Sequence, residues 1–179
     1  MSPGSVSIRT VGDGDEDSLR QVRELIRSFA AEYDACCGAV FAAQGLDAEL
    51  AGLPGRYAGP SGCLLLASDG RLPAGCGAFR DLGDGTCEMK RLYVAPSHRG
   101  TGLGRRLALA LIAAADHAGY RRMVLDSIPE MADAVSLYRR LGFRDATPYW
   151  DHPAGHAIFM AMDLGGEHES DRPGVEPAR

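Results

Sequence analysis

The spacing of hydrophobic residues changes several times along the chain, and each change predicts a different element. Apolar residues three and four positions apart predict helices over residues 13–29, 103–115 and 130–141. Short apolar runs that end at turn-forming residues predict strands. The expected strands cover residues 6–11, 63–67, 74–79, 86–94, 123–125, 143–149 and 158–164. The pattern therefore predicts a mixed sheet whose strands are partly connected by helices.

One segment does not follow either period. Residues 35–45 show no regular hydrophobic spacing, whereas Leu46 to Leu50 are compatible with a short helix that ends at Gly52 and Pro54. Irregular segments on a rigid scaffold often carry specificity, so residues 35–45 are either a substrate-facing element or a plain surface connection. The pattern leaves both interpretations open.

The order of these elements indicates the fold class. It is strand, helices, three antiparallel strands, helix, strand, helix and two strands, which predicts an α/β (α+β) mixed sheet of about six or seven strands. With 179 residues the chain is long enough to bury one sizeable core. We expect a single domain over residues 5–164 and a disordered tail over residues 165–179, which are polar and lack an apolar face.

Composition narrows the class of protein. The net charge of -5 argues against a nucleic-acid partner, because phosphate binding needs a basic face. No stretch is long enough to span a bilayer, so we expect no membrane partner. The five cysteines are odd in number and lack a C-x-x-C spacing, which disfavours a disulfide framework or a zinc site and indicates a reducing cytoplasm. The excess of Arg over Lys indicates a GC-rich coding sequence, and we expect a bacterial source.

The candidate chemistry lies in the stretch from Glu88 to Arg105. It begins as a strand and continues into three glycines at alternate positions, Gly100, Gly102 and Gly104. These glycines let the backbone turn tightly and approach a ligand. The helix that follows offers free N–H groups and a partial positive charge at its N-terminus, and two arginines flank the glycines. This combination predicts a pyrophosphate cradle.

Two common phosphate loops do not fit this stretch. A P-loop requires G-x-x-x-x-G-K-[ST], which the sequence does not contain. A dinucleotide fingerprint requires G-x-G-x-x-G, and the register that starts at Gly100 places Arg105 at the third glycine, which disfavours a Rossmann fold. The pattern that remains is Arg99-x-x-Gly102-x-Gly104.

This pattern resembles the R/Q-x-x-G-x-G/A fingerprint of the GNAT superfamily, the acyl-CoA-dependent N-acyltransferases. About 35 residues later, Leu137-Tyr-Arg-Arg-Leu-Gly-Phe143 resembles the L-Y-x-x-x-G-F motif of the helix after the family's fifth strand. The order of elements agrees from about Ile8 to Leu164. The resemblance implies a mostly antiparallel sheet with a splayed parallel pair and about four flanking helices.

The resemblance also implies acetyl-CoA as cosubstrate. Backbone groups of Leu92 and Val94 would pair with the pantetheine arm as an added strand, and the N–H groups from Arg99 through Arg105 would hold the pyrophosphate. Relatives often carry Asn three residues before the position of Ala134, where this chain has Met131, so one cofactor hydrogen bond is in doubt. The expected cofactor-binding residues are Leu92, Tyr93, Val94, Arg99, Gly100, Thr101, Gly102, Leu103, Gly104, Arg105, Ala134 and Tyr138.

Transfer of an acetyl group to an amine needs a proton acceptor, because an alkylammonium has a pKa of about 10.4 and is protonated at neutral pH. The resemblance implies Glu88 as candidate general base; the alternative is a strand glutamate paired with Lys90 or an arginine. Tyr138 matches a tyrosine that protonates the departing thiolate, and the alternative is a core aromatic residue. The resemblance also implies the Val94 N–H as the donor that stabilises the oxyanion.

Other residues are candidates for the acceptor side. Asp126 ends a strand and either contacts the amine or has a turn or capping role. Tyr149, Trp150 and His152 either line an acceptor pocket or form a plain hairpin turn. His152 and His156 are four apart, but the proline and glycine between them disfavour a helical metal pair, so we expect no metal.

The leading hypothesis is an N-acetyltransferase that acetylates a primary amine of a small molecule or peptide by direct attack in a ternary complex. The alternative is a catalytically silent acyl-CoA-binding sensor or regulatory module, although a sensor needs neither Glu88 nor Tyr138. O-acylation and longer acyl groups share the same fold, and a homodimer stays open. The sequence does not specify the acceptor.

Overall fold

A computed structural model describes residues 6–70 and 72–165, so the tail expected from residue 165 lies, apart from Gly165, outside the described residues. The predicted order of elements is confirmed. The elements are β1 (Ser7–Thr10), α1 (Glu16–Glu32), α2 (Asp34–Ala43), α3 (Leu46–Ala51), β2 (Cys63–Asp69), β3 (Leu72–Gly83), β4 (Thr86–Val94), α4 (Leu103–His117), β5 (Arg122–Ser127), α5 (Ala132–Leu141), β6 (Arg144–Asp145) and β7 (Ile158–Asp163), with 3₁₀ turns η1 (Gly55–Tyr57), η2 (Pro96–His98) and η3 (Pro129–Met131).

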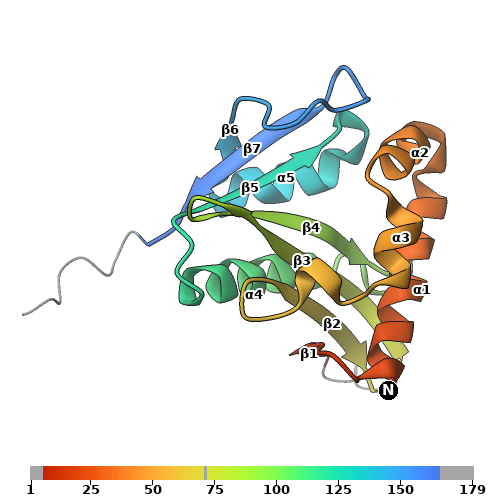
Figure 1. The fold of residues 1–179 in the computed structure, drawn as a ribbon. Coiled ribbons are helices and arrows are strands. Elements are labelled where there is room, and N and C mark those ends of the chain that lie inside the picture. The colour runs from red at the N-terminus through yellow and green to blue at the C-terminus, as the bar shows by residue number, and fades with distance from the viewer. Residues whose placement is uncertain (1–5, 71, 166–179) are drawn as a thin grey trace, which may run out of the picture.

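The strands form one seven-stranded sheet in the order β1-β2-β3-β4-β5-β7-β6 (Figure 1). Neighbouring strands are antiparallel except β4 and β5, which are parallel. A parallel pair needs a crossover connection, and α4 provides it. The predicted mixed α/β class is therefore confirmed.

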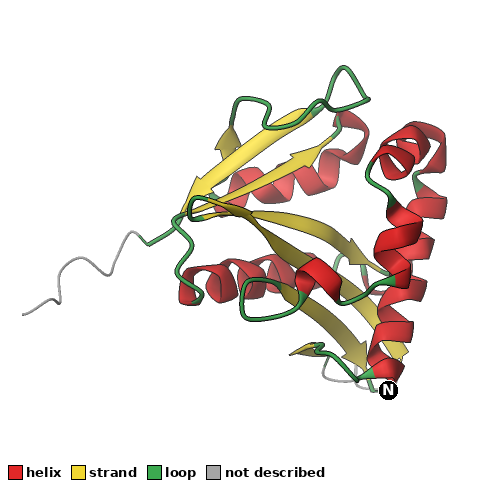
Figure 2. Cartoon of the chain, in the orientation of Figure 1, coloured by secondary structure: helices red, strands yellow, loops and turns green. Residues whose placement is uncertain are grey.

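Helices cover both faces of the sheet (Figure 2). On one side, here called the α4 face, Leu103, Leu107 and Leu111 of α4 share a buried cluster with Tyr138 of α5. On the other side, the α1 face, the stripe of α1 packs with residues of α2 and α3. The sheet thus lies between two separate hydrophobic cores.

Two sequence-based expectations need correction. The absence of a period predicts an irregular segment over residues 35–45, but α2 makes most of them helical. Four of its ten residues are alanine, the best helix former, and the helix has no one-sided apolar stripe that the spacing could reveal. The strand expected over residues 143–149 is reduced to the two residues of β6. Pro148 cannot donate to a ladder, which limits pairing at that end. The short helix expected from Leu46 is present as α3.

A bulge in β4 opens the sheet. Arg91 and Leu92 together face the single residue Gly77 of β3, and Arg91 has φ = +57°, a left-handed conformation that is uncommon outside glycine. The parallel pairing of β4 with β5 ends at Glu88, and beyond that residue the two strands diverge (Figure 1). The gap between them lies at the centre of the molecule.

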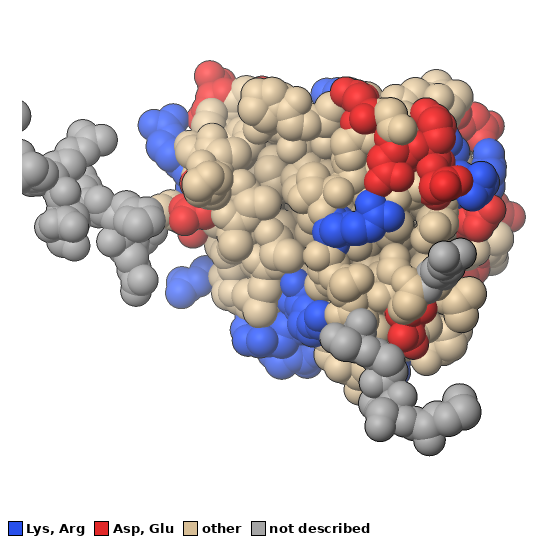
Figure 3. All heavy atoms as spheres, turned by 90° about the horizontal axis from the view of Figure 1, so that it is seen from below, with Lys and Arg blue, Asp and Glu red and all other residues tan. Residues whose placement is uncertain are grey.

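Seen from below, one basic cluster is separated from an acidic cluster by uncharged surface, whereas a second basic group adjoins that acidic cluster (Figure 3). Within the two described ranges, no helix combines the length and apolar character needed to cross a membrane.

Candidate active site

A cavity of about 730 Å³ lies where β4 and β5 diverge. Its walls include residues 89–94 of β4 and residues 126–128 at the end of β5. On the α4 face the wall continues into the start of α4 and into α5, and on the α1 face into α1 and α2. One cavity is therefore lined by residues from both faces of the sheet.

The start of α4 forms one end of the cavity. Gly102 is the N-cap residue with φ = +82°, and no side chain among the described residues caps the helix. The first-turn N–H groups of an α-helix have no intrahelical acceptor, and the helix dipole adds a partial positive charge there. Gly100 and Gly102 both have positive φ, which glycine adopts at low cost. This loop fits a pyrophosphate.

The edge of β4 supplies main-chain groups to the same cavity. The Ala95 N–H donates to the Ala74 carbonyl at 2.9 Å. Bonded and non-bonded positions alternate in an antiparallel pair, so the polar groups of Val94 point away from β3 and toward the gap. Arg99 Nε donates to the Val94 carbonyl at 3.1 Å. The carbonyl of Val94 is thus bonded to Arg99, whereas the N–H of Val94 faces the cavity.

The Arg99 side chain connects the loop before α4 to α1 on the other face of the sheet. Its guanidinium donates to both carboxylate oxygens of Glu32 in α1, at 2.8 and 2.6 Å. Tyr93 also donates to Glu32, at 3.1 Å. These contacts, with the Arg99 hydrogen bond first, lower the pKa of Glu32 despite partial burial. The Arg99 side chain therefore binds α1, and the groups of this loop that are available to an anion are its main-chain N–H groups.

Tyr138 lies on α5 at the cavity wall and is 8% exposed. Its ring packs edge-to-face on Phe143, with centroids 5.8 Å apart. Burial, and then the charge of Asp126, raise the pKa of Tyr138. The hydroxyl stays protonated at neutral pH and can donate a proton. Tyr138 is thus both a core aromatic residue and a cavity residue.

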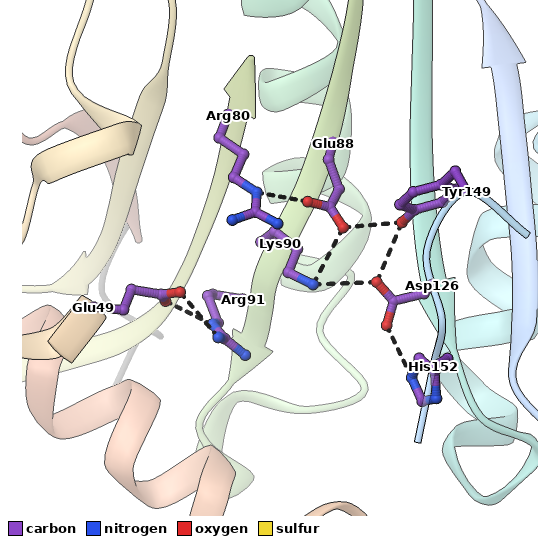
Figure 4. A network of polar contacts seen from close by, with 8 residues as sticks. All are labelled: Glu49, Arg80, Glu88, Lys90, Arg91, Asp126, Tyr149 and His152. Carbon is purple, nitrogen blue, oxygen red and sulfur yellow. Dashed lines mark hydrogen bonds and ion pairs between the residues drawn. The ribbon is translucent and has the colours of Figure 1, made fainter. Parts of the chain in front are cut away.

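Glu88 lies behind the cavity wall and is 1% exposed (Figure 4). It accepts hydrogen bonds from Arg80 Nε at 2.6 Å and from the Tyr149 hydroxyl at 3.0 Å. Arg80 contacts Oε2 of Glu88, whereas Tyr149 contacts Oε1, and Lys90 Nζ lies 3.3 Å from the same Oε1. These are the ion pairs given above as the alternative to a catalytic role. Glu88 reaches the cavity only through its partners.

Asp126 is the carboxylate of this network that lines the cavity (Figure 4). Its Oδ1 accepts from Lys90 at 3.1 Å and from Tyr149 at 3.2 Å, and its Oδ2 lies 3.3 Å from His152 Nε2. Burial alone would raise the pKa of Asp126, but Lys90 and then His152 and Tyr149 outweigh burial and lower it. Asp126 is therefore ionised at neutral pH.

The neighbours of His152 define its orientation. The N–H and the carbonyl oxygen of Ala154 lie 3.1 and 3.2 Å from His152 Nδ1, and Nε2 lies 3.3 Å from Asp126 Oδ2. The ring also packs against that of Trp150, with centroids 4.6 Å apart and an angle of 55° between the ring planes. Among the described residues, no group of three or more His, Cys, Asp or Glu is placed to hold a metal ion.

Arg91 joins the β4 bulge to α3. Its Nε and Nη2 donate to the two carboxylate oxygens of Glu49 at 2.7 and 3.0 Å (Figure 4). The guanidinium also lies 5.8 Å from the centre of the Phe41 ring. The bulge therefore places a second buried ion pair beside the cavity, on the α1 face.

Comparison with known proteins decides the family. A model of the "Acetyltransferase (GNAT) family" matches residues 21–143. An uncharacterised N-acetyltransferase of Schizosaccharomyces pombe is 34% identical over 166 residues, which cover 92% of this chain and 98% of the relative. The chain belongs to the GNAT acetyltransferase family. It is therefore an acyltransferase, and the resemblance of its two motifs is confirmed.

Solved structures share the fold of this acetyltransferase. A GNAT-family acetyltransferase from Staphylococcus aureus aligns with a TM-score of 0.74 at 17% identity, covering 90% of this chain and all of the other. The PaiA N-acetyltransferase of Thermoplasma acidophilum, solved in complex with coenzyme A, aligns with a TM-score of 0.71 at 17% identity over 89% of this chain and 99% of the other. The predicted fold is confirmed.

The acetyltransferase brings most of the expected residues to one cavity. Glu88 and Thr101 do not line it; the Thr101 hydroxyl donates to the His98 carbonyl at 2.7 Å. The expected residues at the wall are Leu92, Tyr93, Val94, Arg99, Gly100, Gly102, Leu103, Gly104, Arg105, Ala134 and Tyr138. Met131, at the position where relatives often carry Asn, also lines it.

Sequence reasoning identified only part of the wall on the α1 face. The segment 35–45, one interpretation of which was a substrate-facing element, contributes Cys37, Val40 and Phe41 to it. Phe29, Tyr33 and Arg91 also line this face and were not expected there. One signal was present in β4, where Glu88 and Lys90 alternate with apolar neighbours and Arg91 then breaks the alternation. A break of this kind marks an inserted residue, and here it marks the bulge. The aromatic residues carried no such signal, because their spacing also fits a plain core.

Proposed function

We propose that this acetyltransferase transfers the acetyl group of acetyl-CoA to a primary amine of a small molecule or peptide, by direct attack within a ternary complex. The observation that carries the proposal is the single cavity beside Tyr138, which is lined by residues from both faces of the sheet. The T. acidophilum neighbour, which was solved with coenzyme A, supports the cosubstrate. Each face would receive one reactant, and the gap in the sheet is where they would meet.

The cosubstrate would lie on the α4 face. The first-turn N–H groups of α4 and the main chain from Arg99 through Arg105 would hold its pyrophosphate. The free edge of β4 at Leu92 and Val94 would pair with the amide groups of the pantetheine arm. Bound there, acetyl-CoA supplies an activated thioester. Ala134 and Leu103 would contribute apolar contacts from the helix starts.

The amine would enter from the α1 face as an ammonium ion. Asp126 is ionised and lines the cavity, so it would attract and orient that cation. The Tyr149 hydroxyl contacts both Asp126 and Glu88, which gives the proton a hydrogen-bonded path away from the amine. In this proposal Glu88 is the general base, and it acts from behind the cavity wall.

Two further groups would act during the transfer itself. The Val94 N–H points into the gap and would stabilise the negative charge that develops on the thioester oxygen. Tyr138, kept protonated by its raised pKa, would give a proton to the departing thiolate. Both groups lie on rigid elements, which fixes their geometry before the substrates arrive.

The test is a panel of primary amines incubated with acetyl-CoA and the purified protein. Release of free CoA and the mass of the acetylated amine are both measured, with an amine-free reaction as the control for hydrolysis. We expect CoA release that depends on the amine and matches the acetylated product. Binding of acetyl-CoA without amine-dependent release for any member of the panel would contradict the proposal and favour a silent acyl-CoA-binding module.

A further inference from the structure

We propose that the acceptor is an arylalkylamine, a primary monoamine carried on an aromatic body with no carboxylate beside the amine. This inference rests on the proposed function and names its acceptor class. It comes from three properties of the α1-face half of the cavity. These are an aromatic wall, cations that are already paired, and one ionised carboxylate at the reacting end.

The aromatic wall consists of Phe29, Tyr33, Phe41 and Tyr93, all of which line the cavity. Phe29 is at its centre, with ring centroids 5.4 Å from those of Tyr33 and Phe41 and 5.5 Å from that of Tyr93. The first two pairs meet edge to face, at 63° and 68°. A substrate ring can extend such a cluster in the same geometry, which favours an aromatic body over a short aliphatic one.

The cations on this side of the cavity are already neutralised. At Lys90 and Arg91 a substrate carboxylate would have to displace a protein carboxylate and leave it largely buried without its partner, which is unfavourable. An amino acid with a free α-carboxylate is therefore a poor acceptor. Lys90 lies 3.3 Å from Glu88 and 3.1 Å from Asp126, and Arg91 lies 2.7 Å from Glu49 (Figure 4). Arg99 lies 2.6 Å from Glu32.

The charge at the reacting end suits a single ammonium group. Asp126 is ionised and its side chain is 8% exposed; it already contacts Lys90 at 3.1 Å, so an incoming ammonium would share this carboxylate with Lys90. Beyond it, Cys37, Val40 and Phe41 of α2 form an apolar part of the wall, and the cavity is also lined by Gln44 and Glu130. An aromatic body would cover the apolar part of this wall, whereas a diamine has no apolar group of that size and would leave it uncovered. A diamine is therefore a poor acceptor as well.

Four probes separate these properties. Phenethylamine has the ring and one amine, phenylalanine adds a carboxylate, 1,4-diaminobutane replaces the ring with a second amine, and ethylamine lacks the ring. The kcat/KM for each is measured at saturating acetyl-CoA. We expect phenethylamine to exceed each of the other three by at least roughly tenfold, which is the lower end of what burial of an aromatic side chain contributes.

A pair of variants tests whether the aromatic wall is responsible. Phe41→Leu keeps an apolar side chain on α2 and removes one ring of the wall. It should lower the ratio of kcat/KM for phenethylamine over ethylamine by roughly fivefold or more, mainly through the KM of phenethylamine. The matched control is Phe79→Leu, because Phe79 packs on Tyr120 in the other core and does not line the cavity. It should leave that ratio unchanged.

The outcomes distinguish the acceptor class from the reaction. A higher kcat/KM for phenylalanine, 1,4-diaminobutane or ethylamine overturns the arylalkylamine assignment and leaves acetyl transfer standing. The same holds if none of the four probes is acetylated but another amine of the wider panel is. If acetyl-CoA binds and no amine is acetylated, the proposed function fails and the assignment fails with it. If Phe41→Leu and Phe79→Leu lower the ratio of kcat/KM for phenethylamine over ethylamine equally, the aromatic wall does not determine the preference.

Discussion

Arg91 shows how a single inserted residue shapes the site. The bulge gives the α1 face one side chain more than strict alternation allows, and that side chain is a guanidinium that is 3% exposed. A buried charge of this kind is tolerated because Glu49 meets it with two hydrogen bonds. The bulge, α3 and the Phe41 ring are thereby fixed relative to one another.

Removal of one partner of this pair should be costly. We expect Arg91→Met to lower the free energy of unfolding by about 3 kcal/mol, because Glu49 would stay largely buried without a counter-ion. The double variant Arg91→Met with Glu49→Leu should recover a large part of that loss, since it leaves no charge behind. Urea unfolding of the three proteins measures both effects. Equal losses in the single and double variants would show that the ion pair is not the cause.

Tyr138 can be tested with a change of one atom. We expect Tyr138→Phe to lower kcat by roughly 10²–10⁴, the usual contribution of a positioned acid. Packing on Phe143 is retained, so the unfolding transition should hardly move. Because its pKa is raised above the ordinary value, the wild-type tyrosine should not cause a loss of kcat between pH 7 and about 10. An unchanged kcat in the variant would exclude Tyr138 as the acid.

At the scale of elements, α4 is flanked by two glycines in the same left-handed conformation, one at each end. Gly102 has φ = +82° before the helix and Gly119 has φ = +87° after it, and an added Cβ would meet no atom within 4 Å at either position. Alanine therefore introduces backbone strain at both sites without a steric clash. Only Gly102 lies at the cavity.

This symmetry gives a matched comparison. We expect Gly102→Ala and Gly119→Ala each to lower the free energy of unfolding by about 1–2 kcal/mol. Gly102→Ala should also raise the Kd of acetyl-CoA by roughly tenfold, since it shifts N–H groups that would bind the pyrophosphate. Gly119→Ala should not change that Kd. Urea unfolding and calorimetric titration measure the two quantities, and an equal change of Kd in both variants would place the anion elsewhere.

Elements with a clear period could be predicted from the sequence. The expected strand over residues 86–94 has the bounds of β4, and the helix after Gly102 is α4. The sequence does not reveal α2 in the same way, because its Ala, Cys, Val and Phe residues surround the helix without a one-sided stripe. Its role at the cavity depends on packing against α1, which local spacing does not encode.

The candidate site likewise has one part that could be predicted from the sequence and one part that could not. The proposed pyrophosphate cradle could be predicted because consecutive residues build it. The network around Glu88 was not, because the register of β3 on β4 places Arg80 opposite Glu88, and Tyr149 arrives from a loop 61 residues away. The sequence indicated an ion pair with Lys90 or an arginine, and the structure contains both.

At the scale of the whole molecule, the site depends on the gap in the middle of the sheet. Each face has its own core, and the two cores meet at the cavity where β4 leaves β5. The Arg99–Glu32 pair crosses this boundary, since it joins the loop before α4 to the end of α1. A ligand bound in the gap would contact elements of both cores and would therefore stabilise the complete fold.

This arrangement predicts a cooperative thermal response. Acetyl-CoA at about 100 times its Kd should stabilise the folded protein by about 2.7 kcal/mol, because the unfolded chain has no cradle. For a protein of this size that corresponds to a rise in Tm of roughly 5–10 °C. Pantetheine, which lacks the pyrophosphate, should give a much smaller rise at the same concentration. Calorimetry should show one transition that moves as a whole. A second transition left at the ligand-free temperature would mean that the two cores unfold independently and that the gap does not couple them.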